Sequence, residues 1–239
     1  MKTALITGGA KRIGAQIVKT LHSNNYDVII HYKSSKKEAQ TLAKSLNNKR
    51  KNSATIVEAE LSNIEGINKL QQSIQSLDLL VNNASVFYPT PISEVNQNSW
   101  DDIININLKS PFFLSQSLSN ALSICKGCIV NIVDIHSQRP LKNHSIYNIS
   151  KSGLVMMTKT LAQEMSPTIR VCGVSPGSIL WPNNDNETSQ QDKEGMLNKI
   201  ALKRQGEEVD IANTVLFLAS SPYITGQIIS VDGGRTLNQ

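Results

Sequence analysis

The sequence predicts an α/β fold, in which one parallel sheet of about seven strands is covered by helices on both faces. Three observations lead to this prediction. Apolar, β-rich runs alternate with helical patterns, glycines follow the first run where a helix opens, and 239 residues with 39% hydrophobic content suit one large core. Strand–helix alternation favours right-handed crossovers and therefore parallel strands. We expect a single domain over residues 1–239.

The expected strands are short apolar runs at residues 3–7, 27–32, 54–58, 77–82, 128–133, 169–174 and 227–231. The expected helices lie between them, at residues 12–23, 35–49, 64–75, 99–123, 145–165 and 207–220. In such a sheet, ligands bind beyond the carboxyl ends of the strands, so residues that directly follow strands are the candidates for function. After the sixth strand comes a polar stretch at residues 183–195 that is typical of a mobile lid.

The bulk composition argues against nucleic-acid and membrane partners. The formal charge of +5 is spread along the chain, and the basic cluster at residues 49–51 is typical of a solvated helix end. No run approaches the roughly 20 apolar residues of a membrane span. No signal-like segment precedes the first strand, so we expect a cytoplasmic protein.

The three cysteines do not make a disulfide framework. Cys125 and Cys128 have the C-x-x-C spacing, but a redox pair of this kind places its nucleophile at a helix N-terminus. Here Gly127 is expected to end a helix and Cys128 to begin a strand, and there is no second pair for zinc. We expect structural thiols and no metal site.

The turn after the first strand carries the first functional motif, in which Gly8 and Gly14 flank the opening of a helix. Glycines let the backbone approach a pyrophosphate, and a helix N-terminus offers amide donors and a positive dipole. The spacing is G-x-x-x-R-x-G, with Arg12 where a middle glycine is often found and Lys11 beside it. An ordinary tight turn is the alternative, but the position after the first strand favours phosphate binding.

The second strand ends in His31, Tyr32, Lys33, Ser34 and Ser35, without the acidic residue that binds an NAD ribose. A lysine, two hydroxyls and a histidine, facing the basic pair of the first turn, would attract a 2′-phosphate. NADPH is therefore the expected cofactor. The serines also suit a simpler role as helix caps, and the two roles are compatible.

Tyr147 and Lys151 stand four residues apart in an expected helix, so their side chains share one face. The ammonium is expected to pull the pKa of the phenol down from about 10, towards a range useful in acid catalysis. Asp134 lies thirteen residues before the tyrosine, where the fifth strand ends, and Asn107 in the long helix is expected beside the lysine. Alone, Tyr-x-x-x-Lys is a weak signal, because many solvated helices carry it.

The fourth strand is followed by Asn83, Ala84 and Ser85, and then by a proline-rich loop that contains Phe87. Core aromatics normally lie within helices and strands, so this ring suits one wall of a slot for a flat ligand. A loop pinned by aromatic packing is the alternative, and the residues alone do not choose between the two.

Together these motifs resemble the short-chain dehydrogenase/reductase superfamily over essentially the whole chain: TG-x-x-x-R-x-G, NNA, Asn107, Tyr147-x-x-x-Lys151, PG and TGQIISVDGG. The resemblance implies a Rossmann-type doubly wound sheet. Two departures, Arg12 for a glycine and Asp134 for the usual catalytic serine, look like the pteridine reductases, as do HY-x-x-S and NNAS-x-FYPTP. An NADPH-dependent pterin reductase, active as a homotetramer, is therefore implied.

The resemblance also implies roles for individual residues. Tyr147 would donate the proton, Lys151 would hold the nicotinamide ribose, and Phe87 would stack on the pterin. Catalytic roles are implied for Asp134, Tyr147, Lys151 and Asn107, and substrate contacts for Arg12, Ser85, Phe87, Asp134 and Tyr147. The implied cofactor site comprises Gly8, Lys11, Arg12, Ile13, Gly14, His31, Tyr32, Lys33, Ser34, Ser35, Glu60, Leu61, Asn83, Ala84, Ser85, Tyr147, Lys151, Pro176, Gly177 and Ser178.

Three functions remain open. The first is reduction of a pterin, such as biopterin, dihydrobiopterin, dihydromonapterin or dihydrofolate. The second is reduction of a carbonyl, such as a 3-oxoacyl thioester; Asp134 argues against it, because a carbonyl needs a neutral donor beside the tyrosine. The third is a non-enzymatic NADPH-binding regulator, against which the intact set of Asn107, Tyr147 and Lys151 argues.

The helices expected at residues 99–123 and 145–165 carry apolar residues on more than one face, including Phe112 and Met156. One sheet does not cover all of them, so a second subunit is expected to. The closing segment at residues 224–239 is a candidate for a second two-fold contact, which would give a tetramer.

Overall fold

The computed structural model describes residues 1–72, 74–179 and 190–237. Within these residues, parallel strands form one seven-stranded sheet in the order β3-β2-β1-β4-β5-β6-β7. The order reverses between β1 and β4, which makes this the switch point at which open α/β sheets bind ligands. The strands are β1 (Lys2–Ile6), β2 (Tyr26–Tyr32), β3 (Ala54–Glu58), β4 (Leu79–Asn82), β5 (Cys128–Ile132), β6 (Arg170–Pro176) and β7 (Ile228–Val231).

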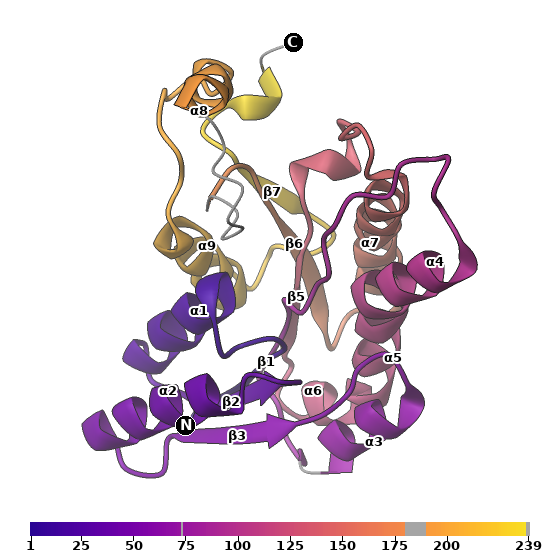
Figure 1. Cartoon of the computed structure of the whole chain (residues 1–239). Coiled ribbons are helices and arrows are strands. Elements are labelled where there is room, and N and C mark those ends of the chain that lie inside the picture. The colour runs from indigo at the N-terminus through magenta and orange to yellow at the C-terminus, as the bar shows by residue number, and fades with distance from the viewer. Residues whose placement is uncertain (73, 180–189, 238–239) are drawn as a thin grey trace.

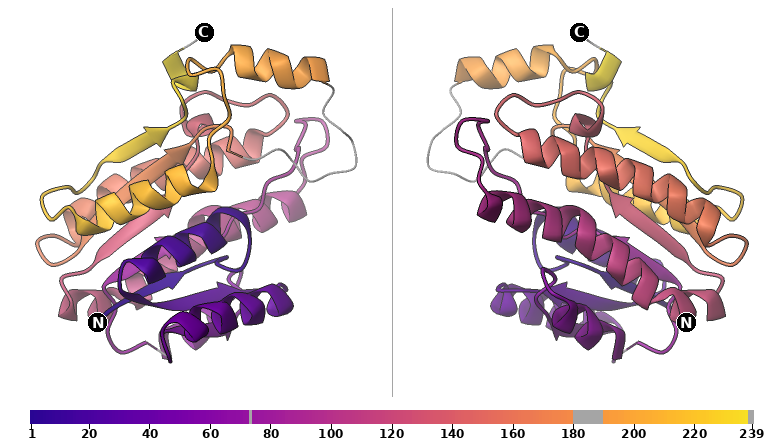
Figure 2. Two further views of the ribbon diagram at one scale, coloured as in Figure 1. Left: turned by 90° about the vertical axis from the view of Figure 1, so that its left-hand side faces the viewer. Right: turned by 90° about the vertical axis from the view of Figure 1, so that its right-hand side faces the viewer.

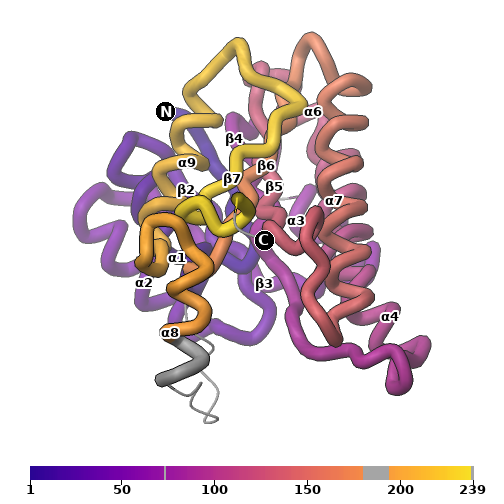
Figure 3. Tube along the Cα trace, turned by 90° about the horizontal axis from the view of Figure 1, so that it is seen from above, coloured from indigo at the N-terminus to yellow at the C-terminus, as the bar shows by residue number. Residues whose placement is uncertain are grey.

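Helices cover both faces of the sheet (Figures 1 and 2). One face carries α1 (Arg12–Ser23), α2 (Lys36–Lys49) and α9 (Glu208–Ser220). The other carries α3 (Ile64–Gln72), α4 (Gln97–Ile104), α5 (Ser110–Ser117), α6 (Ser119–Ile124) and α7 (Ser145–Glu164). Figure 3 shows the sheet between α1, α2 and α9 on one side and α4 and α7 on the other. Each face has its own apolar core, so the Rossmann-type α/β fold is confirmed.

The long helix expected at residues 99–123 is not continuous. A π-helical turn, η1 (Asn105–Lys109), separates α4 from α5, and a break at Leu118 separates α5 from α6. Pro111 accounts for the first interruption, because it lacks the N–H that would bond to the carbonyl of residue 107 in a regular helix. The turn therefore widens where Asn107 lies.

The expected lid falls only partly within the described residues. Residues 183–189 of the expected lid lie outside the described residues, and residues 190–195 begin α8 (Gln190–Asn198), a helix that the sequence did not predict. Short 3₁₀ turns, η2 (Ile135–Ser137) and η3 (Arg235–Leu237), follow β5 and β7.

No helix in the described ranges combines the length and apolarity that a bilayer crossing requires.

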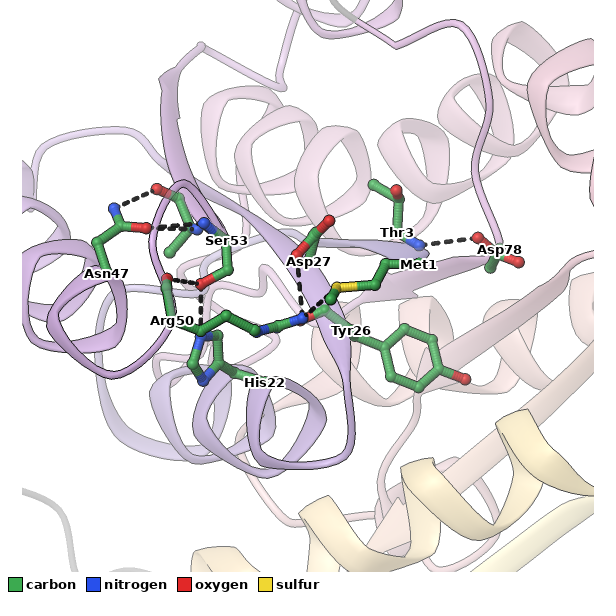
Figure 4. Close-up of polar contacts among 10 residues, drawn as sticks. Met1, Thr3, His22, Tyr26, Asp27, Asn47, Arg50, Ser53 and Asp78 are labelled. Atoms are coloured by element: carbon green, nitrogen blue, oxygen red, sulfur yellow. Dashed lines mark hydrogen bonds and ion pairs between the residues drawn. The ribbon is translucent and has the colours of Figure 1, made fainter.

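Arg50 lies at the end of the sheet where β2 and β3 begin, and its side chain contacts β2 (Figure 4). Its guanidinium donates to the carbonyl of Tyr26 and pairs with Asp27 at 3.2 Å. The hydroxyl of Ser53 donates to the Arg50 carbonyl and lies 2.7 Å from Nε2 of the buried His22. The prediction of a solvated helix end at residues 49–51 is therefore wrong for Arg50, because its side chain ties α2 to β2.

The cysteines lie where the sequence suggested. Cys125 caps the carboxyl end of α6, Cys128 opens β5, and both are free thiols, as is Cys172. Gly127 approaches the backbone so closely that a Cβ there would lie 2.9 Å from the carbonyl oxygen of Leu77. The two cysteines are therefore three residues apart because a tight turn at Gly127 connects α6 to β5.

Candidate active site

The turn between β1 and α1 leaves its backbone open to a ligand. Gly8 has a φ of +61°, and a Cβ on Gly14 would lie 2.3 Å from the Gly8 carbonyl oxygen, so neither position accepts a larger side chain without strain. Arg12 has a φ of +50°, which is the left-handed backbone conformation that glycine adopts most readily. Lys11, the N-cap residue of α1, makes no side-chain cap bond, which leaves the first amides of the helix to an anion.

His31 holds this turn in place from below. The amide of Gly8 donates to its Nδ1 at 3.0 Å, and its Nε2 donates to the carbonyl of Ala59 at 3.1 Å. Burial lowers the pKa of His31, and both ring nitrogens are already occupied, so the ring is neutral. His31 therefore positions the glycine turn, and it does not offer the cationic phosphate contact that the sequence suggested.

A cavity of about 400 Å³ opens at the switch point, in front of the glycine turn. It lies between the ends of β2 and β3 and the loop after β4. Every residue expected at the cofactor site between Gly8 and Ser85 lines it: Gly8, Lys11, Arg12, Ile13, Gly14, His31, Tyr32, Lys33, Ser34, Ser35, Glu60, Leu61, Asn83, Ala84 and Ser85. The lining does not include Pro176, Gly177 or Ser178, and Ser178 instead bonds to Gln205 and Gly206.

Two of the three basic side chains in this lining have acidic partners. Nζ of Lys33 lies 2.5 Å from Oε2 of Glu60, and Nζ of Lys11 lies 2.8 Å from Oε1 of Glu38. The sequence showed no acid at the end of β2, but these carboxylates come from the end of β3 and from α2. The region where the sequence predicts a 2′-phosphate is therefore less positive than the residues at the end of β2 alone suggest.

Tyr147, Asp134 and Lys151 come together at the carboxyl end of β5. The phenol of Tyr147 donates to Oδ2 of Asp134 at 2.9 Å, and Oδ1 of Asp134 accepts the amide of His136 at 2.8 Å, which caps η2. Nζ of Lys151 lies 5.7 Å from the centroid of the tyrosine ring and donates to the carbonyl of Ile132 at 3.0 Å. The shared helical face and the strand-end carboxylate thus meet as expected.

The expected direction of the tyrosine pKa is wrong for this arrangement. Burial, followed by the charge of Asp134 and its hydrogen bond, raises the pKa of Tyr147 well above its ordinary value. Burial also lowers the pKa of Lys151 to about 8, against the opposing effect of Asp134. The carboxylate lies closer to the phenol than the ammonium does, so its effect on the phenol prevails.

Asn107 lies in the widened turn η1 and is fully occupied. Its Oδ1 accepts from the hydroxyl of Ser85 at 3.0 Å and from the amide of Val86 at 2.8 Å. Its Nδ2 donates to the Val86 carbonyl at 3.0 Å and to the hydroxyl of Ser150 at 3.2 Å. The side chain therefore fixes the loop after β4 to α7 through the residue before Lys151, and it makes no bond to Lys151 itself.

Phe87 lies on that loop and is 53% exposed. Its ring centroid lies 4.8 Å from that of Tyr147, with the rings nearly perpendicular, and 4.7 Å from that of His144, with the rings stacked at 14°. The ring is therefore pinned by aromatic packing and still accessible, and its role as a wall of a ligand slot stays a prediction. The sequence analysis missed His144; its one signal was the position three residues before Tyr147, at the start of the expected helix.

The family model described as Enoyl-(Acyl carrier protein) reductase matches residues 8–236. The chain belongs to the short-chain dehydrogenase/reductase superfamily. Pteridine reductase 1 of Leishmania tarentolae is 33% identical over 99% of this chain and 96% of its own length. The 3-oxoacyl-(acyl-carrier-protein) reductases FabG of Staphylococcus epidermidis and Rickettsia bellii are 35% and 37% identical, over 98% and 99% of this chain and 98% and 97% of their own lengths.

As a member of the short-chain dehydrogenase/reductase superfamily, the chain is a nicotinamide-dependent oxidoreductase. Relatives with two different substrate names are similar to it to nearly the same degree. The substrate therefore has to be argued from the side chains of the site.

Proposed function

We propose that this superfamily member reduces pterins with NADPH, and that its substrate is biopterin, dihydrobiopterin, dihydromonapterin or dihydrofolate. The hydrogen bond from Tyr147 to Asp134 carries the proposal. A pterin is reduced at a C=N bond, so hydride addition at carbon leaves a ring nitrogen that needs a proton. A phenol paired with a carboxyl group is suited to deliver it, and the nearby ring of Phe87 offers a flat surface for the heterocycle.

The cavity residues fit NADPH. The cradle of Gly8 and Gly14 admits a pyrophosphate but no added Cβ. Arg12 and Lys33 line the region assigned to the 2′-phosphate, and Ser35 makes no side-chain cap bond at the start of α2, which leaves its hydroxyl to the cofactor. NADPH, when bound there, supplies the hydride.

The chain's own residues hold and move the proton. Tyr147 and Asp134 share one proton between their oxygens, and its loss to the substrate nitrogen would leave two negative groups in contact. The ammonium of Lys151 offsets that charge, and the half-buried Asp134 passes a proton from solvent back to the phenol.

A second candidate is reduction of a 3-oxoacyl thioester, which the names of the two bacterial relatives favour. A carbonyl reductase stabilises an oxygen that becomes negative, and the carboxylate of Asp134 would repel it. We prefer the pterin for this reason.

We further propose that the protein works as a cytoplasmic homotetramer. Ile149 and Met156 on α7 are 49% and 62% exposed, and Phe112 on α5 is 40% exposed. Large apolar side chains on helices that already cover one face of a sheet are typical of subunit contacts.

The test is NADPH oxidation with biopterin, dihydrobiopterin, dihydromonapterin, dihydrofolate and an acetoacetyl thioester. We expect kcat/KM for one pterin to exceed that for the thioester by about tenfold or more. Tyr147→Phe should lower kcat by about 10²–10⁴-fold and still bind NADPH. Faster turnover of the thioester than of every pterin would contradict the proposal in favour of the carbonyl substrate.

A further inference from the structure

Glu60 lies just beyond β3 in the wall of the cofactor cavity, and its two carboxylate oxygens have different partners. Oε1 accepts the amide of Ser62 at 3.1 Å, and Oε2 pairs with Nζ of Lys33. The Ser62 amide therefore orients the carboxylate of Glu60. The second oxygen, Oε2, faces Lys33, which is the lysine proposed to bind a 2′-phosphate.

The position of Glu60 is set by the start of α3. A Cβ on Gly66 would lie 1.7 Å from the Glu60 carbonyl oxygen, so α3 packs directly on the Glu60 peptide. Burial raises the pKa of Glu60, but Lys33 and Ser62 outweigh it and hold that pKa below its usual value. The side chain is therefore a fixed negative charge at neutral pH.

A bound 2′-phosphate, with close to two negative charges, would compete with this carboxylate for Lys33. Lys33 is exposed and Glu60 is half-buried, and ion pairs with an exposed partner contribute little to folding, so the lysine is free to exchange Glu60 for a phosphate. Lys11 is paired with Glu38 in the same way. Among the described residues of the lining, Arg12 is the one basic side chain outside an ion pair.

We infer that Glu60 is a specificity-determining residue, which lowers the preference for NADPH over NADH below what Lys33 alone would give. The inference rests on the proposed NADPH site and deepens it. Removal of the Glu60 charge should strengthen the binding of NADPH. The binding of NADH should stay almost unchanged, because NADH has a hydroxyl group in place of the 2′-phosphate.

The test is a direct fluorescence titration of both reduced cofactors with the wild type and with Glu60→Gln, which needs no turnover. We expect the Kd for NADPH to fall about three- to tenfold and the Kd for NADH to change less than about twofold. Glu58→Gln is the matched control. Glu58 is an exposed acid at the end of β3; its carboxylate accepts from the Tyr32 hydroxyl and forms no ion pair with a lysine among the described residues.

The outcomes separate this inference from the proposed function. If the wild type binds NADH more tightly than NADPH, the proposed cofactor is wrong. If the wild type prefers NADPH but Glu60→Gln leaves the ratio unchanged, or Glu58→Gln shifts it equally, the inference on Glu60 fails and the proposed function stands. Weaker binding of both cofactors to a Glu60→Gln protein with unchanged thermal unfolding would also overturn the inference, because Glu60 would then support the cavity as a whole.

Discussion

The phenol of Tyr147 donates to one oxygen of Asp134, while the other oxygen of the same carboxylate accepts the amide that opens η2. The tyrosine is held by α7 and the aspartate by the end of β5, so two rigid elements set the distance between them. A substitution at either position therefore removes the same proton-carrying unit.

The first prediction follows from this pair. Tyr147→Phe and Asp134→Ala should each lower kcat for the pterin by about 10²–10⁴-fold, and the double variant should be little worse than either single one. Asp134→Ser should not restore the reaction, because serine cannot resupply a proton at neutral pH. Steady-state kinetics check this, with the Kd for NADPH as the control. Near-normal pterin turnover in Asp134→Ser would remove the main reason to prefer pterins over carbonyls.

The second prediction concerns pH. The pKa of Lys151 is lowered to about 8, so its positive charge is present below that pH and lost above it. kcat/KM should therefore be level below pH 8 and fall by about tenfold per pH unit above it. Lys151→Arg, which stays charged, should lower the rate but remove the break at pH 8. A wild-type profile that stays level to pH 10 would show that the charge of Lys151 is not needed.

Phe87→Ala should raise KM for the pterin by about threefold to more than tenfold, since the lost stacking is worth about 0.5–1.5 kcal/mol beyond the buried area. The Kd for NADPH should change little, and Phe87→Tyr should keep most of the affinity. Loss of both ligands in equal measure would instead mean that the ring serves only to pin the loop.

The next prediction is a loss of stability in mild acid. Burial, Arg50 and Lys49 lower the pKa of His22, and burial lowers that of His31. Below the unfolded value of about 6.5, the unfolded chain takes up protons that the native chain does not, so stability falls as pH falls. Each histidine contributes at most about 1.4 kcal/mol per pH unit. Urea unfolding between pH 7.5 and 5.5 should show the slope, and His22→Gln should reduce it; greater stability at pH 5.5 than at 7.5 would contradict the assignment.

The last prediction addresses assembly. Met156→Glu places a charge on the exposed apolar face of α7, and should convert a tetramer into smaller species at micromolar concentration. Lys44→Glu, at an exposed position of α2 on the opposite face of the sheet, is the control that should leave the mass unchanged. Analytical ultracentrifugation measures both, and a monomeric wild type would refute the tetramer.

The sheet and the catalytic pair were predictable because they depend on local pattern. Alternating strands and helices impose parallel order, and the four-residue spacing of Tyr147 and Lys151 brings them to one face after a strand that ends near Asp134. The partners of Lys11 and Lys33 were not predictable, since Glu38 and Glu60 reach them from other elements and only the packed structure brings them together. The predicted direction of the Tyr147 pKa was wrong for the same reason, because burial and the contact with Asp134 raise that pKa and both arise only in the packed structure.

The place of β1 in the sheet has a consequence for synthesis in the cell. Its backbone pairs with β2 on one edge and with β4 on the other, and β4 begins only at Leu79. At roughly 5–20 residues per second, one edge of this apolar strand stays unpaired for several seconds after it leaves the ribosome. An open strand edge invites pairing with other chains. Until β4 emerges, the open edge of Lys2–Ile6 is therefore exposed to pairing with other chains, and a ribosome-associated chaperone that covers it would reduce aggregation.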